Sequence, residues 1–267
     1  MTEDIEFSII MPALNEEKNI TLAIRNALEA IDHFGIKGEI IVINDGSTDK
    51  TEALIQSYMA RDPRVRSITH ARRLGIGASF WDGVDQARGN FMVMLPGDNE
   101  NDPMEIFRYH TLLKSVDIVI PFVFNKHVRS AYRNALSFIY RFIINTTFLV
   151  NFNYTNGTVL YRKALLDELE FRSSGFFFQT DILVRTVKRG YLFAEVPYRL
   201  DLRSQGVSKA ITFPNLFMVI RGYLRLVRDI YWPTPENAPK RYVSCSQTAK
   251  RYHECENLER TGSNSKP

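Results

Sequence analysis

The chain has 267 residues, of which 45% are apolar and 24% are charged, and its formal net charge at pH 7 is +4. This composition supports a substantial hydrophobic core, in one large domain or two small ones, and argues against intrinsic disorder for most of the chain. No apolar run reaches the roughly 18–20 residues that span a bilayer, and the acidic start MTEDIEFSII is not typical of a signal peptide. We therefore expect a cytoplasmic location unless a partner holds the chain elsewhere.

Strand-like and helix-like segments alternate along the first half of the chain. In chain order we expect a strand at 7–14, a helix within 16–34, a strand at 39–45, a helix within 46–58, a strand at 65–69, a helix within 75–88 and a strand at 90–95. This alternation predicts an α/β fold with a mostly parallel central sheet flanked by helices on both faces. Ligands of such sheets bind beyond the carboxyl ends of the strands. The stretches PALNEE, NDGSTD and PGDNEND follow three of these strands and are the candidates for a site.

Three acidic residues alternate in the loop after the strand at 90–95, namely Asp98, Glu100 and Asp102. In an extended loop their carboxylates lean to one side, which would attract a metal ion or a basic side chain. The spacing does not fit an EF-hand, because Pro103 and Tyr109 occupy the positions where that loop needs Gly and Glu. The alternative is a solvated turn that begins a helix after Pro103.

The sequence lacks the glycine-rich loops that bind nucleotide phosphates in many proteins of this fold class. The first strand is not followed by G-x-G-x-x-G, which argues against a dinucleotide cofactor, and the chain contains no P-loop motif. What remains is a nucleotide held by acidic residues and a metal. Asn15 and Asp45, at two strand ends, are candidates for it, and their alternative role is a turn or a helix cap.

Basic residues are distributed unevenly along the second half. No acidic residue lies between Asp117 and Asp167, and none lies from 203 to 228. Such segments suit phosphates, nucleic acid or a membrane surface, and the absence of a recognition-motif spacing argues against nucleic acid. We expect 128–152 and 211–232 to form basic amphipathic helices that lie on a membrane surface, the alternative being that both only pack on the sheet.

Hydrophobic periodicity is lost after about residue 233. We expect one domain at 1–232, followed at 233–267 by a linker and a disordered tail. Both cysteines, Cys245 and Cys255, lie in this tail, so the chain has no disulfide framework. Together with His253 they offer three ligands, which is weak evidence for a metal site beside the four-ligand spacings of structural zinc.

Six stretches of the chain resemble, in the same order, those of glycosyltransferase family 2, whose members have the GT-A fold. The resemblance covers residues 7 to about 230. Its last stretch, in which EVP is followed by R-x-x-G-x-S-K, resembles the branch that transfers sugars to polyprenyl phosphates such as dolichyl or undecaprenyl phosphate. The six stretches are SIIMPALNEEKNI, IIVINDGSTDKT, RRLGIGAS, PGDNENDP, GFFFQTDILVRTVKRGY and AEVPYRLDLRSQGVSK.

This resemblance implies a nucleotide-sugar donor and a divalent metal. Mg²⁺ or Mn²⁺ would be held by Asp98 and Glu100 and would neutralise charge on the departing nucleoside diphosphate. The family motif D-x-D is incomplete here, because Pro96 stands in place of its first acid. The donor-binding residues that the resemblance implies are Pro12, Asn15, Glu16, Asp45, Gly75, Gly77 and Asp98.

The resemblance also implies an acceptor side. Asp181 matches the acid that serves as general base for a hydroxyl acceptor, whereas with a phosphate acceptor it would only position groups. Its alternative role is a charge at a helix N-terminus. Arg203 and Lys209 would act as catalytic cations that close over the donor and acceptor phosphates. The acceptor phosphate would be bound by Arg129, Arg133 and Ser208.

The expected activity is metal-dependent, inverting transfer of a sugar from a nucleotide-sugar to a polyprenyl phosphate. The enzyme would work as a peripheral protein at the inner, cytoplasmic membrane face, where a membrane-spanning partner or a second copy could help to hold it. Two alternatives stay open: a family-2 transferase that acts on a saccharide or another hydroxyl acceptor, and a degenerate, non-catalytic nucleotide-binding module.

Overall fold

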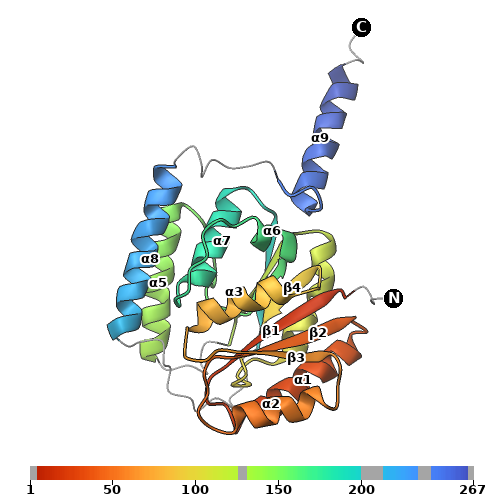
Figure 1. Cartoon of the computed structure of the whole chain (residues 1–267). Coiled ribbons are helices and arrows are strands. Elements are labelled where there is room, and N and C mark those ends of the chain that lie inside the picture. Colours follow the sequence, from red (N-terminus) through yellow and green to blue (C-terminus); the bar gives the residue numbers. More distant parts are fainter. Residues whose placement is uncertain (1–4, 126–130, 200–212, 234–241, 264–267) are drawn as a thin grey trace.

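The computed structural model describes residues 5–125, 131–199, 213–233 and 242–263 of the chain, shown as coloured ribbon in Figure 1. Within these ranges the side chains of Arg133, 213–215 and 259–263 are not described. All structural statements below refer to the described residues.

Seven strands of the described chain form one sheet, in the order β3-β2-β1-β4-β6-β5-β7. Only β6 is antiparallel to its two neighbours, which confirms the expected mostly parallel sheet. The chain runs from β1 through β2 to β3 on one side and then places β4 on the other side of β1. Such a switch point is where open sheets of this kind bind ligands. The strands are β1 (Phe7–Ala13), β2 (Gly38–Asn44), β3 (Val65–Thr69), β4 (Phe91–Met94), β5 (Ile118–Val123), β6 (Leu160–Arg162) and β7 (Phe193–Tyr198).

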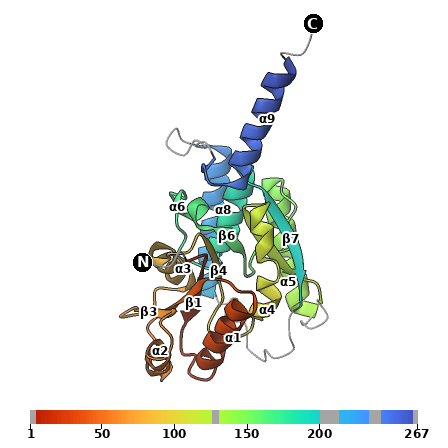
Figure 2. The ribbon, with the colours of Figure 1, turned by 90° about the vertical axis from the view of Figure 1, so that its right-hand side faces the viewer.

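Helices cover both faces of the sheet, as Figures 1 and 2 show. The helices α1, α2 and α3 connect the first four strands, at the places where the sequence predicts helices. The helices are α1 (Ile20–His33), α2 (Thr51–Met59), α3 (Ile76–Gln86), α4 (Pro103–Phe107), α5 (Ala131–Phe148), α6 (Lys163–Asp167), α7 (Phe178–Lys188), α8 (Phe213–Tyr231) and α9 (Gln247–Ser263), with a 3₁₀ turn at His110–Lys114.

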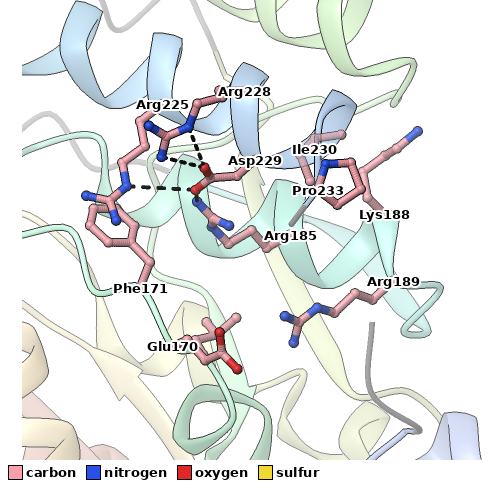
Figure 3. A pocket seen from close by; sticks show the side chains of 11 residues that line it. Glu170, Phe171, Arg185, Lys188, Arg189, Arg225, Arg228, Asp229, Ile230 and Pro233 are labelled. Atoms are coloured by element: carbon pink, nitrogen blue, oxygen red, sulfur yellow. Dashed lines mark hydrogen bonds and ion pairs between the residues drawn. The ribbon is translucent and has the colours of Figure 1, made fainter. Parts of the chain in front are cut away.

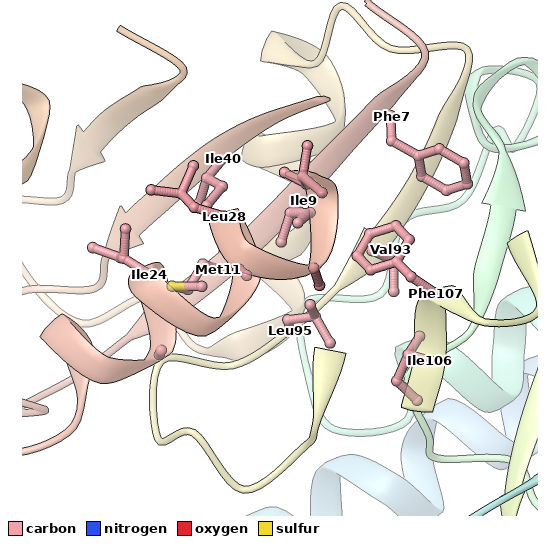
Figure 4. Packing of buried hydrophobic residues seen from close by; sticks show 14 of the residues in the cluster. Phe7, Ile9, Met11, Ile24, Leu28, Ile40, Val93, Leu95, Ile106 and Phe107 are labelled. Carbon is pink, nitrogen blue, oxygen red and sulfur yellow. The ribbon is translucent and has the colours of Figure 1, made fainter. Parts of the chain in front are cut away.

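Two hydrophobic cores result from the alternation of side chains along the buried strands. On β1, Ile9 and Met11 point to the face covered by α1, where Ile24 and Leu28 meet them (Figure 4). Ile10 points to the opposite face, into a second cluster that includes residues of α3, α5, α7 and α8. Because both faces of these strands are buried, they are apolar runs without an alternating polar pattern.

The helices α5 and α8 lie side by side and expose apolar side chains. Thr147 Oγ1 of α5 and Tyr223 OH of α8 are 2.8 Å apart, and the Phe148 ring contacts Tyr223. Each helix packs one side on the second core, and contact of the other side with a membrane stays a prediction. We call their exposed residues the apolar face: Tyr132, Phe138, Ile139, Phe142 and Ile143 of α5, with Leu216, Phe217, Met218, Ile220, Leu224 and Tyr231 of α8. Among the described helices, none combines the length and the apolar character needed to cross a bilayer.

The C-terminal segment differs from the expected disordered tail, because residues 247–263 form α9, which projects from the body (Figures 1 and 2). Its first turn is held by Asp117, a fully buried residue just before β5. The Asp117 carboxylate accepts hydrogen bonds from the backbone of Gln247 (2.7 Å) and Thr248 (3.0 Å). A buried carboxylate needs donors and a helix start offers free N–H groups, so the two satisfy each other. Periodicity could not reveal α9, since an almost wholly polar helix has no apolar stripe.

Candidate active site

The carboxyl ends of β1, β2 and β4 meet, which brings three of the predicted loops together. The backbone N–H of Asp45 donates to the Ala13 carbonyl (2.9 Å), and that of Gly97 donates to the Pro12 carbonyl (2.9 Å). The loop after β1 is therefore flanked by the NDGSTD loop on one side and the acidic loop on the other. We call this edge of the sheet, where the sequence analysis expects the nucleotide, the donor crevice.

Asn15 links the first two loops. Its backbone N–H donates to Ser47 Oγ (3.0 Å), and its side-chain oxygen accepts from the Thr48 N–H (2.8 Å). Its φ of 56° is in the left-handed region, which asparagine tolerates better than most residues. The neighbouring Glu16 donates its N–H to Thr51 Oγ1 (2.8 Å). Asn15 thus shapes the loop instead of capping α1, which begins at Ile20.

Asp45 is buried and its carboxylate is already hydrogen-bonded. It accepts from the backbone N–H groups of Leu74 (2.7 Å) and Gly75 (2.9 Å). His70 Nδ1 lies 2.8 Å from the same carboxylate, and His70 Nε2 lies 3.0 Å from an Asp82 oxygen without hydrogen-bond alignment. Our sequence prediction missed His70 and Asp82. His70 directly follows β3, so the strand-end rule that selected Asp45 could have found it.

The two predicted glycines of the RRLGIGAS stretch have different reasons to be glycine. Gly75 has a φ of 101°, a conformation that other residues rarely adopt. A Cβ on Gly77 would lie 2.5 Å from the carbonyl carbon of Ser174, so the first turn of α3 packs directly on the backbone before α7. Gly75 therefore lets its N–H reach Asp45, and Gly77 brings the donor-side and acceptor-side segments together.

The acidic loop turns sharply instead of running extended. Asp98 Oδ1 accepts from the Glu100 N–H (3.0 Å), and Asn99 between them has a φ of 57°. Asp102 caps α4 by accepting from the Met104 N–H (2.9 Å). The expected row of three alternating carboxylates is thus replaced by one helix cap and two residues of a turn, because local hydrogen bonds compete with the extended form.

The two remaining carboxylates suit a metal that is shared with the donor. Within the described ranges, no group of three His, Cys, Asp or Glu side chains is placed to hold a metal ion. Asp98 and Glu100 nevertheless offer the hard oxygen ligands that Mg²⁺ and Mn²⁺ prefer, and Mg²⁺ commonly takes its other ligands from substrate phosphates and water. Glu100 also lines a cavity of about 190 Å³ beside α1. The two carboxylates therefore fit part of the ligand set of a divalent ion.

Asp181 lies in the first turn of α7 and is 2% exposed. Its Oδ2 pairs with Arg185 Nε (2.9 Å), and Arg185 in turn reaches Asp229 of α8 (2.8 Å). Its Oδ1 is buried and has no hydrogen-bond partner among the described residues. Burial raises the pKa of the Asp181 carboxyl above its ordinary value, although the Arg185 guanidinium acts in the opposite direction. The structure thus shows Asp181 as an incompletely paired buried acid that holds Arg185.

Five predicted acceptor-side and catalytic residues have no described side chain. Arg129, Arg203, Ser208 and Lys209 lie outside the described residues, and Arg133 belongs to α5 but its side chain is not described. Their assigned roles remain predictions.

The sequence profile of Glycosyl transferase family 2 matches residues 8–170. The chain therefore belongs to glycosyltransferase family 2 and is a glycosyltransferase, as the six stretches indicate.

Curated relatives include two enzymes named for lipid-linked products. The chain is 28% identical over 223 residues to the polyprenol monophosphomannose synthase of Mycolicibacterium smegmatis. This match covers 75% of this chain and 79% of that protein. It is 30% identical over 105 residues to the dodecaprenyl-phosphate galacturonate synthase of Rhizobium johnstonii. This second match spans 39% of the chain and only 31% of the length of that relative.

Solved structures share the fold. Glucosyl-3-phosphoglycerate synthase of Mycobacterium tuberculosis in complex with UDP superposes with a TM-score of 0.63 at 20% identity, over 85% of this chain and 80% of that chain. The same synthase in complex with Mn²⁺, UDP and phosphoglyceric acid gives a TM-score of 0.63 at 20% identity, over 84% of this chain and 78% of that chain. These similarities confirm the predicted GT-A architecture.

Proposed function

We propose that this enzyme transfers a sugar from a nucleotide-sugar to a polyprenyl phosphate at the cytoplasmic face of a membrane. The observation that carries the proposal is the apolar face of α5 and α8, on helices that do not span a bilayer. Exposed apolar side chains on basic amphipathic helices are typical of proteins that lie in the headgroup region. Similarity to the polyprenol monophosphomannose synthase over most of the chain supports the same acceptor class.

The donor would bind in the crevice beyond β1, β2 and β4. Two segments would enclose the nucleoside. One is the loop after β1, with Pro12, Asn15 and Glu16, and the other is Asp45 with Gly75, which is hydrogen-bonded to it. Asp98 and Glu100 would hold Mg²⁺ or Mn²⁺, which when bound neutralises charge on the departing diphosphate. The crevice side chains themselves bind and orient the donor.

The pairing of Asp181 with Arg185 is compatible with a phosphate acceptor, which needs no general base. A hydroxyl nucleophile needs a base within hydrogen-bond reach, whereas a phosphate is already anionic. Asp181 is buried, and its solvent-shielded carboxylate is engaged with Arg185. In the proposed reaction it keeps Arg185 in place and removes no proton. Arg129, Arg133 and Ser208 would bind the acceptor phosphate, and Arg203 and Lys209 would offset the charge that develops between donor and acceptor.

The direct test is an acceptor and donor panel with the purified full chain. Nucleotide-sugars would be offered with a polyprenyl phosphate in vesicles or with water-soluble hydroxyl acceptors, in Mg²⁺, in Mn²⁺ or in EDTA. We expect product only with the lipid phosphate and a divalent ion. Undiminished turnover in EDTA would contradict the metal assignment, and a preference for a soluble hydroxyl would overturn the lipid-phosphate acceptor.

A further inference from the structure

A second cavity lies between the C-terminal ends of α7 and α8 and shares no lining residue with the donor crevice (Figure 3). Its volume is about 360 Å³, within the range of small-ligand pockets, roughly 300–1,000 Å³. The walls come from the last turns of both helices, from the segment around Phe171 and from Pro233. None of the expected site residues lines it.

Positive charge dominates this cavity. Its charged lining residues are two acids, Glu170 and Asp229, and five cations, Arg185, Lys188, Arg189, Arg225 and Arg228.

Acidic partners hold the arginines in place but do not balance their charge. Asp229 pairs with Arg185 (2.8 Å), with Arg228 (2.9 Å) and, at a longer distance, with Arg225 (3.8 Å). Arg185 also pairs with Asp181 (2.9 Å), so three guanidinium groups share two carboxylates. Arg225 also lies over the Phe171 ring, 3.5 Å from its centre. Guanidinium groups fixed in this way lose little freedom when an oxyanion arrives, and they offer it several paired donors.

Two further cations have no such partner. Within the part of the chain that the structure describes, neither Lys188 nor Arg189 is ion-paired with an acidic side chain. A helix C-terminus favours a cation, which would explain Lys188 on α7 and Arg228 on α8 separately. It does not explain why cations of two helices line one cavity.

The chain leads directly from the apolar face to the cavity wall. Tyr231 of that face and the exposed Trp232 directly precede Pro233 of the cavity wall. Tyrosine and tryptophan are enriched at the level of lipid headgroups. If α8 lies on a membrane, these two residues would bring the C-terminal end of α8, which lines the cavity, close to the lipid phosphates.

We propose that the cavity between α7 and α8 binds a phosphate group, with the guanidinium groups of Arg225 and Arg228 and the side chains of Lys188 and Arg189 as its donors. The ligand class is a phosphomonoester or phosphodiester, whether the headgroup of an anionic phospholipid or a soluble phosphate. The site does not depend on the transfer reaction, so its failure would leave the proposed activity standing.

The test compares two charge-matched double variants of the full chain. Lys188→Gln/Arg189→Gln removes two cavity cations outside the Asp229 cluster, while Arg141→Gln/Arg221→Gln removes two cations of α5 and α8 that do not line the cavity. Each would be sedimented with vesicles of pure phosphatidylcholine or of phosphatidylcholine with phosphatidylglycerol. In parallel, thermal unfolding would be followed in inorganic phosphate or glycerol phosphate against chloride at equal ionic strength.

We expect the cavity variant to bind phosphatidylglycerol vesicles about tenfold more weakly than the outer variant. Diffuse attraction loses about 1 kcal/mol per removed cation in both variants, and only the cavity variant also loses contacts of a site. If the cavity variant loses only vesicle binding, the ligand is a lipid headgroup. If soluble phosphate raises the Tm of wild type to a plateau and does not raise that of the cavity variant, the ligand is a soluble phosphate. Equal weakening of both variants would show diffuse attraction only and overturn the site, as would wild-type behaviour of the cavity variant in both arms.

Discussion

Two buried carboxylates, Glu39 on the donor side of the sheet and Asp181 on the acceptor side, are paired in opposite ways. Glu39 of β2 accepts from Ser8 Oγ (2.8 Å) and from the guanidinium groups of Arg66 (2.8 Å) and Arg88 (2.7 Å). Burial alone would raise the Glu39 pKa, but these hydrogen bonds outweigh it and hold the pKa below its ordinary value. Asp181 has one partnered oxygen, and its pKa is raised.

The difference separates an anchor from a candidate functional group. A fully satisfied buried carboxylate ties strands and loops into one rigid unit, and Glu39 does so for β1, β2, β3 and the loop before β4. An incompletely satisfied one is rare in native structures and marks sites where another group is to be met or where a charge is kept poised. The donor half of the sheet thus rests on a rigid frame, while Asp181 on the acceptor side keeps one carboxylate oxygen unpartnered among the described residues.

The largest effect should come from removing the anchor. Glu39→Gln should lower the free energy of unfolding by about 3 kcal/mol, the lower end for a broken buried ion pair, because Arg66 and Arg88 remain partly exposed. Since the folded pKa of Glu39 is lowered, its contribution is present above the ordinary pKa and is lost as pH falls. Urea unfolding between pH 4 and pH 7 would measure this. Glu29→Gln, in an exposed pair with Arg25, is the control and should change stability by less than about 0.5 kcal/mol. An equal loss in both variants would contradict the anchor role.

The metal assignment is tested within one loop. Asp98→Asn should lower kcat/KM about 100-fold, since the loss of even an outer-shell metal partner costs roughly 10–100-fold. Asp102→Asn should leave turnover within about twofold, because asparagine caps a helix as well as aspartate does. Steady-state rates at several Mn²⁺ concentrations would separate lost metal affinity from misfolding. Comparable losses in both variants would assign the effect to the loop fold instead of the metal.

The acceptor side is tested through the apolar face. Phe138→Ser/Phe142→Ser removes two stacked rings that are 58% and 61% exposed. Binding to vesicles should weaken about tenfold, because full burial of one such side chain contributes up to about 3 kcal/mol and partial insertion a fraction of it. Nucleotide binding should not change. Tyr252→Ser/Leu258→Ser, on the exposed surface of α9, is the matched control. Unaltered vesicle binding by the α5 variant would show that this face does not meet the membrane.

A smaller effect is expected at His70. His70→Phe keeps a ring of similar size but removes the nitrogen 2.8 Å from Asp45. The KM for the active donor should rise about 2–10-fold, the range of one hydrogen bond of 0.5–1.5 kcal/mol, while kcat stays nearly constant. His33→Phe, at the end of α1, is the control. A fall in kcat with an unchanged KM would show that His70 does not position the donor-side acid.

The smallest effect is expected for the stability of an Asp181 variant. Asp181→Asn should alter stability at pH 7 by less than about 1 kcal/mol, because the carboxylate is incompletely paired and Arg185 keeps Asp229. With a raised folded pKa, the contribution of Asp181 is present below its ordinary pKa and is lost as pH rises through the folded pKa. The stability of this variant relative to wild type should therefore rise from pH 4 to pH 7, opposite to that of Glu39→Gln. If the stability relative to wild type changes with pH in the same direction in both variants, the contrast between the two acids is wrong.

Much of the donor half was predictable because its information is local. Apolar runs and helical periodicity predicted β1 to β4 and the helices between them within a few residues, and the rule of strand ends selected the loops of Asn15, Asp45 and Asp98. Pro103 likewise marked the start of α4. The amphipathic character of α5 and α8 was also readable, since a stripe of one kind of side chain is a property of the sequence itself.

What the sequence could not supply were partnerships between distant residues. Nothing local indicates that Asp117 holds the first turn of α9, that Asp102 caps a helix while Asp98 does not, or that Asp45 meets His70. The same holds for the cavity, whose cations come from two helices about forty residues apart along the chain. Sequence patterns record which residues share a face of one element, but burial and charge pairing depend on which faces the fold brings together, and only the tertiary structure decides that.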